Sequence, residues 1–387
     1  MDELWRQINA NRIAADTLRL IRIASPTGDT REMADAYESM LAEAGCTIER
    51  YEFIPDNPTL VASFGDDRSG SGKTIIFNGH MDVVPLEHEP ARVEEGIIHG
   101  RGACDMKGSL ACIVEVLRVL QESGTQLSGK LIIIANSLHE SPGGRGEDLA
   151  ALVERVNLRA DAAVVMEGAR YDCTVAQLGS ATFEIEIRRE GEPTHQLYTA
   201  PGTPHPITVA AEVVRRLNEM NLVLEQDYIE DTGYASYFVG SLHSGQFYNQ
   251  HPNRAEIVGV RRYNPQVSFD EVERELRGVL AEIAEQYRVN IELDLRKVRD
   301  GYRIDKNDPA VSALLEAVRK VRNIELPLVG KKVVVDACFF VNGLGIPTVC
   351  HGPDQSSSHG DKEFADLLDL KQTAQVYMQF IHEYMSQ

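Results

Sequence analysis

Four acidic or histidine side chains are predicted to close strands in the first half of the chain. The apolar run 74–77 is typical of a buried strand, and His80 comes shortly after it. By the same pattern we expect Asp105, Glu140 and Glu167 to follow strand ends. Because α/β proteins gather their chemistry at the carboxyl ends of strands, we expect these four side chains at one edge of one sheet.

His359, in the sequence Ser-Ser-Ser-His-Gly-Asp at 356–361, is a fifth candidate. Two neutral imidazoles and three carboxylates suit a pair of zinc-like cations about 3.5–4 Å apart, with one carboxylate bridging them. Each residue alone is weak evidence, since a single histidine after a strand usually caps it and a single glutamate is usually solvated. The ordered set is what predicts a metal centre.

Composition excludes several other classes of function. The formal net charge of −20 over 387 residues argues against nucleic acid or an anionic membrane surface as a partner. The sequence begins acidic and polar, so no secretory signal is expected, and no apolar run approaches the roughly 20 residues of a membrane span. The six cysteines lack the paired spacings of zinc ribbons or disulfide scaffolds. These features predict a cytoplasmic enzyme with reduced thiols.

The order of predicted elements indicates an α/β protein with an insertion. Helices, the first at 2–21, alternate with short apolar strands, which predicts a three-layer α/β fold of the phosphorylase/hydrolase-like kind. The segment 182–188 instead alternates with period two and opens a β-α-β-β-α-β order, as in ferredoxin-like folds. We therefore predict a catalytic metal-binding domain at 1–178 and 300–387, interrupted by an inserted α+β domain at 179–299.

Two motifs resemble those of a known family. A Gly-His-x-Asp-Val-Val-Pro stretch is matched by residues 79–85, and a Gly-x-x-Asp-x-Lys-Gly stretch by residues 102–108. The sequence resembles, over nearly its whole length, the co-catalytic metallopeptidase and deacylase family of acetylornithine deacetylase, succinyl-diaminopimelate desuccinylase, aminoacylase and glutamate carboxypeptidase. The resemblance implies two divalent metal ions, zinc in the first place, with cobalt and manganese also suited to these ligands.

The resemblance also assigns the ligands. His80, Asp105 and Glu167 would hold one cation, and Asp105, Glu140 and His359 the other, so that Asp105 bridges the pair. Asp82 would orient the His80 imidazole from behind, as metal-bound histidines commonly require.

The chain departs from this family at His139. The family normally places two glutamates in succession here, the first as general base and the second as ligand, whereas this chain has His139 followed by Glu140. Imidazole can replace a carboxylate, because its free pKa of about 6.5 suits proton transfer near neutrality. His139 is either a working base, the mark of an altered substrate or reaction, or the mark of a protein without turnover. Cys338, where the family often has arginine, is a second departure.

In the inserted domain the resemblance implies three further residues. His195 stands where the family places a lid histidine that reaches the partner subunit's active site and stabilises the oxyanion. Asn249 lies in a turn ending Asn-x-x-Pro, whose first glycine is replaced here by Ser244. Arg262 resembles a lid arginine that binds a substrate carboxylate, with Arg261 as the alternative.

Together these observations predict a metal-dependent hydrolase. Its substrate would be an N-acyl amino acid or small peptide with a free carboxylate, cleaved at an amide-like bond, and the protein would be a homodimer through the lid. The alternative is a non-catalytic or impaired family member that binds metal and a small ligand. A thiol enzyme using Cys104 is disfavoured, because that residue lies beside a proposed ligand and no dedicated base is visible.

Overall fold

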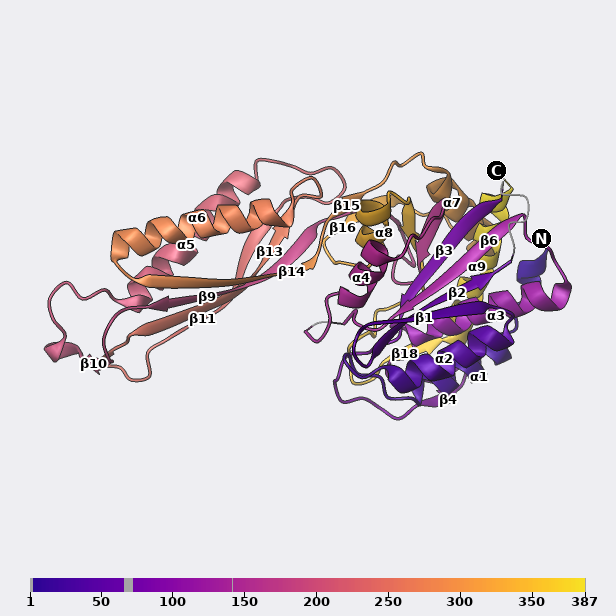
Figure 1. Cartoon of the computed structure of the whole chain (residues 1–387), viewed down its shortest axis with the longest axis horizontal. Helices are drawn as coiled ribbons and strands as arrows, with labels where there is room; N and C mark the ends of the chain where they lie inside the picture. Colours follow the sequence, from indigo (N-terminus) through magenta and orange to yellow (C-terminus); the bar gives the residue numbers. More distant parts are fainter. Residues whose placement is uncertain (1–2, 66–71, 141, 387) are drawn as a thin grey trace. The chain divides into compact units, whose positions relative to one another are not determined.

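The computed structural model in Figure 1 describes residues 3–65, 72–140 and 142–386. The chain divides into two compact units, and each is described by itself. The α/β unit comprises Met1–Val175, Ile304–Val329 and Val335–Gln387, and the insert unit comprises Ala176–Arg303 and Gly330–Val334.

A six-stranded sheet forms the centre of the α/β unit, in the order β1-β2-β6-β3-β7-β17. Its strands are β1 (Thr47–Ile54), β2 (Asn57–Phe64), β3 (Lys73–His80), β6 (Gly129–Asn136), β7 (Ala162–Val165) and β17 (Thr348–Cys350). β1, β2 and β6 pair antiparallel, whereas β6, β3, β7 and β17 run parallel. His80 is the last residue of β3 and therefore stands at the carboxyl end of a central parallel strand.

Helices pack around this sheet in two groups. α9 contacts α1, α3 and α7, α1 also contacts α3, and α4 contacts α8. The helices are α1 (Ala10–Ile21), α2 (Arg31–Glu43), α3 (Lys107–Ser123), α4 (Glu147–Arg155), α7 (Pro309–Arg322), α8 (Ala337–Leu344) and α9 (Leu367–Met385). A smaller sheet, in the order β18-β5-β4, is formed by β4 (Arg92–Glu94), β5 (Ile97–His99) and β18 (Phe364–Asp366). This arrangement confirms the predicted α/β class.

The predicted continuous helix at 2–21 is wrong. A short 3-10 helix, η1 (Leu4–Gln7), comes first, and α1 begins only at Ala10. The break is at Asn9, whose side chain accepts the backbone N–H groups of Asn11 and Arg12 and so caps the new helix. The predicted start at Asp2 lies outside the described residues.

The insert unit has the predicted β-α-β-β-α-β order. Its elements are β9 (Gly179–Arg188), α5 (Pro206–Leu224), β11 (Ser236–Ser244), β13 (Arg254–Tyr263), α6 (Phe269–Tyr287) and β14 (Asn290–Arg299). The strands form one antiparallel sheet in the order β11-β13-β9-β14. Phe183, Ile185 and Ile187 of β9 alternate with polar residues and are buried with apolar side chains of α5 and α6.

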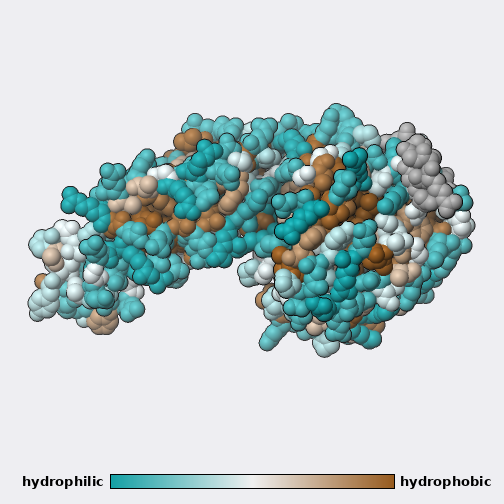
Figure 2. All heavy atoms as spheres, in the orientation of Figure 1, coloured by the Kyte–Doolittle hydropathy of each residue, from teal (hydrophilic) through white to brown (hydrophobic). Residues whose placement is uncertain are grey.

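Short elements complete the insert unit and the segments where the chain passes from one unit to the other. A two-residue pairing joins β10 (Thr194–His195) to β12 (Gln250–His251), and the 3-10 helix η2 (Gln196–Tyr198) follows β10. Three boundaries between the units fall within or next to β8 (Cys173–Gln177), β15 (Tyr302–Arg303) and β16 (Leu328–Lys331), and the fourth falls in the loop between β16 and α8. In the view of Figure 2, hydrophilic residues cover most of the surface and hydrophobic residues show between them on both units. In the described part of the chain, no helix has the length and apolarity that crossing a membrane requires.

His351 should make the protein less stable in acid. Its side chain is completely buried, and its Nδ1–H donates to the Ala169 carbonyl over 3.2 Å. Burial, together with the charges of Arg322 and Arg170, lowers the pKa of His351 to about 3. The unfolded chain has a histidine pKa of about 6.5. As the pH falls from about 6.5 towards 3, protons therefore bind the unfolded state but not the folded one, and stability is lost.

Urea unfolding at pH 7 and pH 4 measures this effect. When the pH is lowered from 7 to 4, we expect protonation of His351 in the unfolded chain to lower the free energy of unfolding by about 3 kcal/mol. In His351→Gln the side-chain amide keeps a hydrogen-bond donor but does not titrate, so the loss on acidification should be smaller by this amount. Equal losses in the two proteins would contradict the assignment.

Candidate active site

The structure brings the five predicted metal ligands together in the α/β unit. His80 Nε2 lies 3.2 Å from Asp105 Oδ1, and His359 Nε2 lies 3.4 Å from Asp105 Oδ2. His359 Nε2 is also 3.2 Å from Glu140 Oε1, and a Glu167 carboxylate oxygen lies within 4.8 Å of a ring nitrogen of His80. Asp105 thus presents one carboxylate oxygen to each imidazole.

The prediction that Asp105 closes a strand is wrong. Asp105 lies in a turn immediately before α3, while Glu140 and Glu167 lie in loops beyond β6 and β7. The turn is held by Glu363, whose carboxylate accepts the backbone N–H groups of Cys104 and Asp105, each over 3.2 Å. A distant carboxylate, rather than a strand end, therefore positions this ligand.

Asp82 supports the site in more ways than predicted. Its carboxylate accepts the backbone N–H groups of His139, at 3.1 Å, and Glu140, at 2.9 Å, and the Thr27 hydroxyl at 2.8 Å. His80 Nδ1 lies 2.9 Å from the Asp82 backbone carbonyl and 3.4 Å from its carboxylate. The carbonyl is thus the nearer acceptor for the imidazole, and the carboxylate mainly holds the segment that carries His139 and Glu140.

The loop that carries His359 also reaches Asp105. Gln355 Nε2 donates to Asp105 Oδ1 over 3.1 Å. His359 itself has φ +62°, a left-handed conformation that residues other than glycine seldom adopt. Such conformations concentrate at functional sites, where the surrounding contacts hold them in place.

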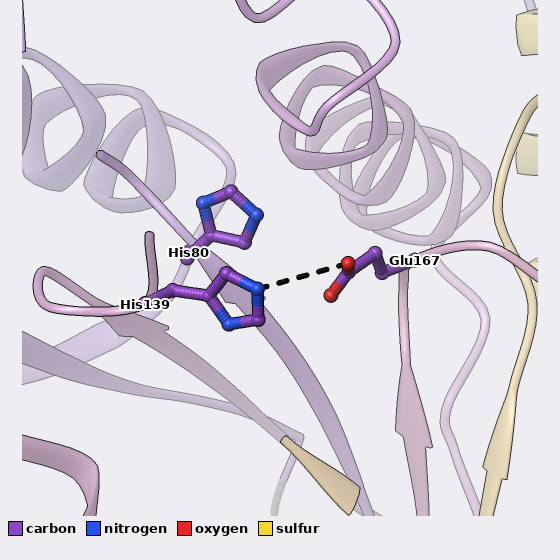
Figure 3. Close-up of side chains that lie close together, drawn as sticks. All are labelled: His80, His139 and Glu167. Atoms are coloured by element: carbon purple, nitrogen blue, oxygen red, sulfur yellow. Dashed lines mark ion pairs between the residues drawn. The ribbon is translucent and has the colours of Figure 1, made fainter. Parts of the chain in front are cut away.

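His139 faces the same cluster (Figure 3). Its Nε2 lies 3.7 Å from Glu167 Oε1, and its Nδ1 lies 3.0 Å from Asp336 Oδ2. The ring stacks on His80, with centroids 4.2 Å apart and planes 6° from parallel. Burial alone lowers the pKa of His139, but without metal ions Asp336 and Glu167 outweigh it and raise the pKa to about 9. Cations bound beside the ring would lower this pKa and favour its neutral, proton-accepting form.

The donor set fits divalent cations. Glu167 is buried, which raises its pKa to about 7, and its Oε2 has no hydrogen-bond partner among the described residues. A buried carboxylate oxygen without a donor is costly, and a cation would satisfy it. Hydrogen bonds to Asp105 and Glu140 raise the pKa of His359 to about 10, so protons and cations compete for these atoms.

In the insert unit the two candidate arginines have different surroundings. Arg261 lies over the Tyr237 ring at 4.4 Å, with Nη2 3.6 Å from Glu275. Arg262 is the next residue of β13, so its side chain leaves the opposite face of the sheet. Its Nη1 is buried and has no hydrogen-bond partner within the described ranges. Each arginine thus has a buried donor without a partner among the described residues, since Arg261 Nε is also unpaired, but Arg261 has the Glu275 and Tyr237 contacts as well.

His195 and Asn249 lie side by side in the insert unit. His195 Nδ1 accepts the backbone N–H of Leu197 over 3.2 Å, and its Nε2 lies 3.1 Å from the side-chain amide of Asn249. Both side chains are hydrogen-bond partners at β10 and β12, near the exposed residues Tyr198 and Tyr248.

Comparison with known proteins identifies the family. The profile of peptidase family M20/M25/M40 matches residues 76–383, which is well over half of the chain. The chain belongs to this family. The resemblance drawn from the motifs is thereby confirmed, and this M20 chain is an enzyme that hydrolyses amide-type bonds.

Curated relatives span the full length of this M20 chain. N-formyl-4-amino-5-aminomethyl-2-methylpyrimidine deformylase of Halalkalibacterium halodurans is 22% identical over 421 residues, covering 99% of this chain and 97% of the relative. Succinyl-diaminopimelate desuccinylase of Methylobacterium radiotolerans is 26% identical over 397 residues, covering 97% and 96%. Both identities are low, so these relatives do not assign the substrate of this chain.

Solved structures share the fold of this M20 chain. A tripeptidase from Staphylococcus aureus superposes with a TM-score of 0.81 at 19% identity, covering 98% of this chain and 100% of that one. A dinuclear metal-binding peptidase of the M20 family from Bacillus subtilis superposes with a TM-score of 0.69 at 16% identity, covering 97% and 98%. The predicted α/β fold with an inserted α+β domain is confirmed.

Sequence reasoning missed four residues that support this site. Thr27, Gln355 and Glu363 hold the ligands or their neighbours, and Asp336 contacts His139. Thr27 lies in a Ser-Pro-Thr-Gly turn, and Asp336 lies two residues before Cys338. Both segments therefore had a feature in the sequence that could have pointed to these residues. Cys338 itself is a buried residue of α8.

Proposed function

We propose that this M20 chain is a divalent-metal-dependent hydrolase of N-acyl amino acids or small peptides with a free carboxylate. The observation that carries the proposal is the position of Asp105, whose two carboxylate oxygens face two different imidazoles. A carboxylate shared in this way suits two cations better than one.

The ligand assignment follows these contacts. His80, Asp105 and Glu167 would hold one cation, and Asp105, Glu140 and His359 the other. Zinc is the first candidate, with cobalt and manganese accepted by the same nitrogen and oxygen donors. The chemistry that divalent cations supply in such sites is activation of water and polarisation of a carbonyl oxygen.

The remaining steps belong to the side chains. His139 Nε2 faces the ligand cluster, where it takes the proton of the attacking water and passes it to the leaving nitrogen. Asp82 keeps His139 and Glu140 in place through their backbone N–H groups. His195 donates its Nε2–H to the developing oxyanion. Asn249 and Arg262 bind the substrate.

The insert unit serves as lid and dimerisation domain in this proposal. Exposed apolar side chains at the end of α5, on β11 and in the loops beside β10 and β12 support a homodimer; among them are Leu197, Tyr198, Leu222, Val223, Phe238 and Tyr248. The six cysteines are free thiols, which supports a reducing, cytoplasmic location.

A substrate panel tests the function. The purified protein, loaded with zinc, cobalt or manganese, is assayed against N-formyl, N-acetyl and N-succinyl amino acids, dipeptides and tripeptides. The same acyl groups on amines without a carboxylate form the second half of the panel, because one relative is a pyrimidine deformylase. We expect turnover of carboxylate substrates. Hydrolysis of only the carboxylate-free amides would contradict the substrate class, and no turnover at all would contradict the proposed function.

Arg262→Gln should weaken carboxylate binding. Removing a guanidinium that pairs with a carboxylate should lower kcat/KM by about 30–300-fold, mostly through KM. Arg254→Gln is the matched control, since Arg254 lies on the same strand but is exposed and paired with Glu186 and Glu256. Steady-state kinetics on one N-acyl amino acid compare the variants. Equal, small effects of both changes would exclude Arg262 as the carboxylate ligand.

A further inference from the structure

His139 is held by a buried carboxylate from a distant part of the chain. Its Nδ1 lies 3.0 Å from Asp336 Oδ2, and the two residues are 197 positions apart in sequence. The side chains are 11% and 2% exposed. A contact this short between two nearly buried polar groups fixes the orientation of the imidazole, because its Nδ1–H needs an acceptor.

Asp336 is itself anchored to the central sheet. Asn136 Nδ2 donates to Asp336 Oδ2 over 3.0 Å, and Asn136 Oδ1 accepts from Asn78 Nδ2 over 2.9 Å. Asn78 and Asn136 lie on the neighbouring strands β3 and β6, and both are completely buried. The acceptor for His139 is therefore held by a chain of hydrogen bonds that starts on two central strands of the sheet, β3 and β6.

The second ring nitrogen faces the ligand cluster. His139 Nε2 points towards Glu167, as Figure 3 shows. The His80 ring, stacked on His139 and 6° from parallel to it, limits the ways in which Nε2 could bind a metal. An imidazole binds a metal through a lone pair in its own ring plane, and two stacked planes do not share such a point. Simultaneous coordination of one cation by His80 and His139 is therefore disfavoured.

We propose that Asp336 is a positioning residue, which accepts the Nδ1–H of His139 and so keeps the Nε2 lone pair directed into the ligand cluster. The proposal rests on the proposed function for its kinetic consequence, but not for the hydrogen bond itself. A glutamate at position 139 would have no ring N–H for Asp336 to accept.

A double-mutant cycle tests the proposal kinetically. Asp336→Ala removes the acceptor, and we expect kcat to fall by about 100-fold or more with little change in KM. Asp336→Asn, which keeps the size of the side chain, should give a smaller loss and guards against misfolding of the alanine variant. In the His139→Glu background both changes should leave kcat nearly unchanged, since a glutamate has no Nδ1–H for Asp336 to accept. Equal losses in both backgrounds would show a merely structural role and overturn the proposal.

Nuclear magnetic resonance of the metal-free protein tests the hydrogen bond without any assay. The wild type should show a histidine Nδ1–H resonance that is shifted downfield and protected from solvent exchange, and that is absent from His139→Glu. It should persist in the control Asp148→Asn, which alters another buried carboxylate that contacts Thr59 and Ser137 instead. The resonance should disappear in Asp336→Ala.

The two readouts separate the possible failures. If no substrate is hydrolysed but the protected resonance depends on Asp336, the proposed function fails and the pairing stands. If the resonance is absent from the wild type, or survives in Asp336→Ala, the pairing is wrong whatever the activity.

Discussion

Removing divalent cations with a chelator should abolish amide hydrolysis, and adding zinc, cobalt or manganese should restore it. Asp105→Asn should have nearly the same effect in the loaded protein, lowering kcat/KM by about 10³-fold or more. Residues that only support a ligand typically cost 10–100-fold. Asp105 contacts both His80 and His359 through separate oxygens, so its replacement disturbs both halves of the cluster.

Asp361→Asn is the control for this substitution. Asp361 is an exposed acid in the loop that carries His359, and it should be replaceable without loss of activity. Metal content of each variant is measured alongside the rate. A chelated protein that keeps its full rate, or an Asp105→Asn variant that keeps both its metal and its rate, would contradict the proposed chemistry.

His139→Ala should lower kcat by about 10²–10⁴-fold, the usual contribution of a general acid–base group. The change in KM should be much smaller, because the imidazole acts in the proton-transfer step and not in substrate binding. Metal content should stay the same, since the stacking on His80 argues against coordination by His139. Steady-state kinetics and metal analysis together measure these effects.

His88→Ala is the matched control, as His88 is exposed and its Nδ1 contacts only a neighbouring backbone carbonyl in the described structure. It should keep wild-type kinetics. A decrease in kcat of less than about tenfold in His139→Ala would show that His139 is not the general base. A loss of metal in that variant would instead make His139 a ligand.

The sequence predicted the architecture and the family well because both depend on local patterns. Period-two alternation in β9 marked the insert, and an apolar run before His80 marked a strand end at the site. The position of Asp105 could not be obtained in this way, because Glu363 holds its turn from 258 residues away. No spacing rule encodes a contact of that range.

Side-chain surroundings were similarly hidden in the sequence. Arg261 and Arg262 are chemically identical neighbours, and only the sheet shows that Arg261 lies over Tyr237 while Arg262 leaves the other face. His139 was recognisable as a departure from the family pattern. Its partner Asp336 was not, because the pairing depends on where α8 begins relative to the sheet.

Anomalous diffraction from crystals grown with zinc tests the central claim most directly. The account predicts two zinc sites per chain, one bounded by His80, Asp105 and Glu167 and the other by Asp105, Glu140 and His359, with Asp105 in contact with both. A single site, no site in this cluster, or zinc held by other residues would contradict it.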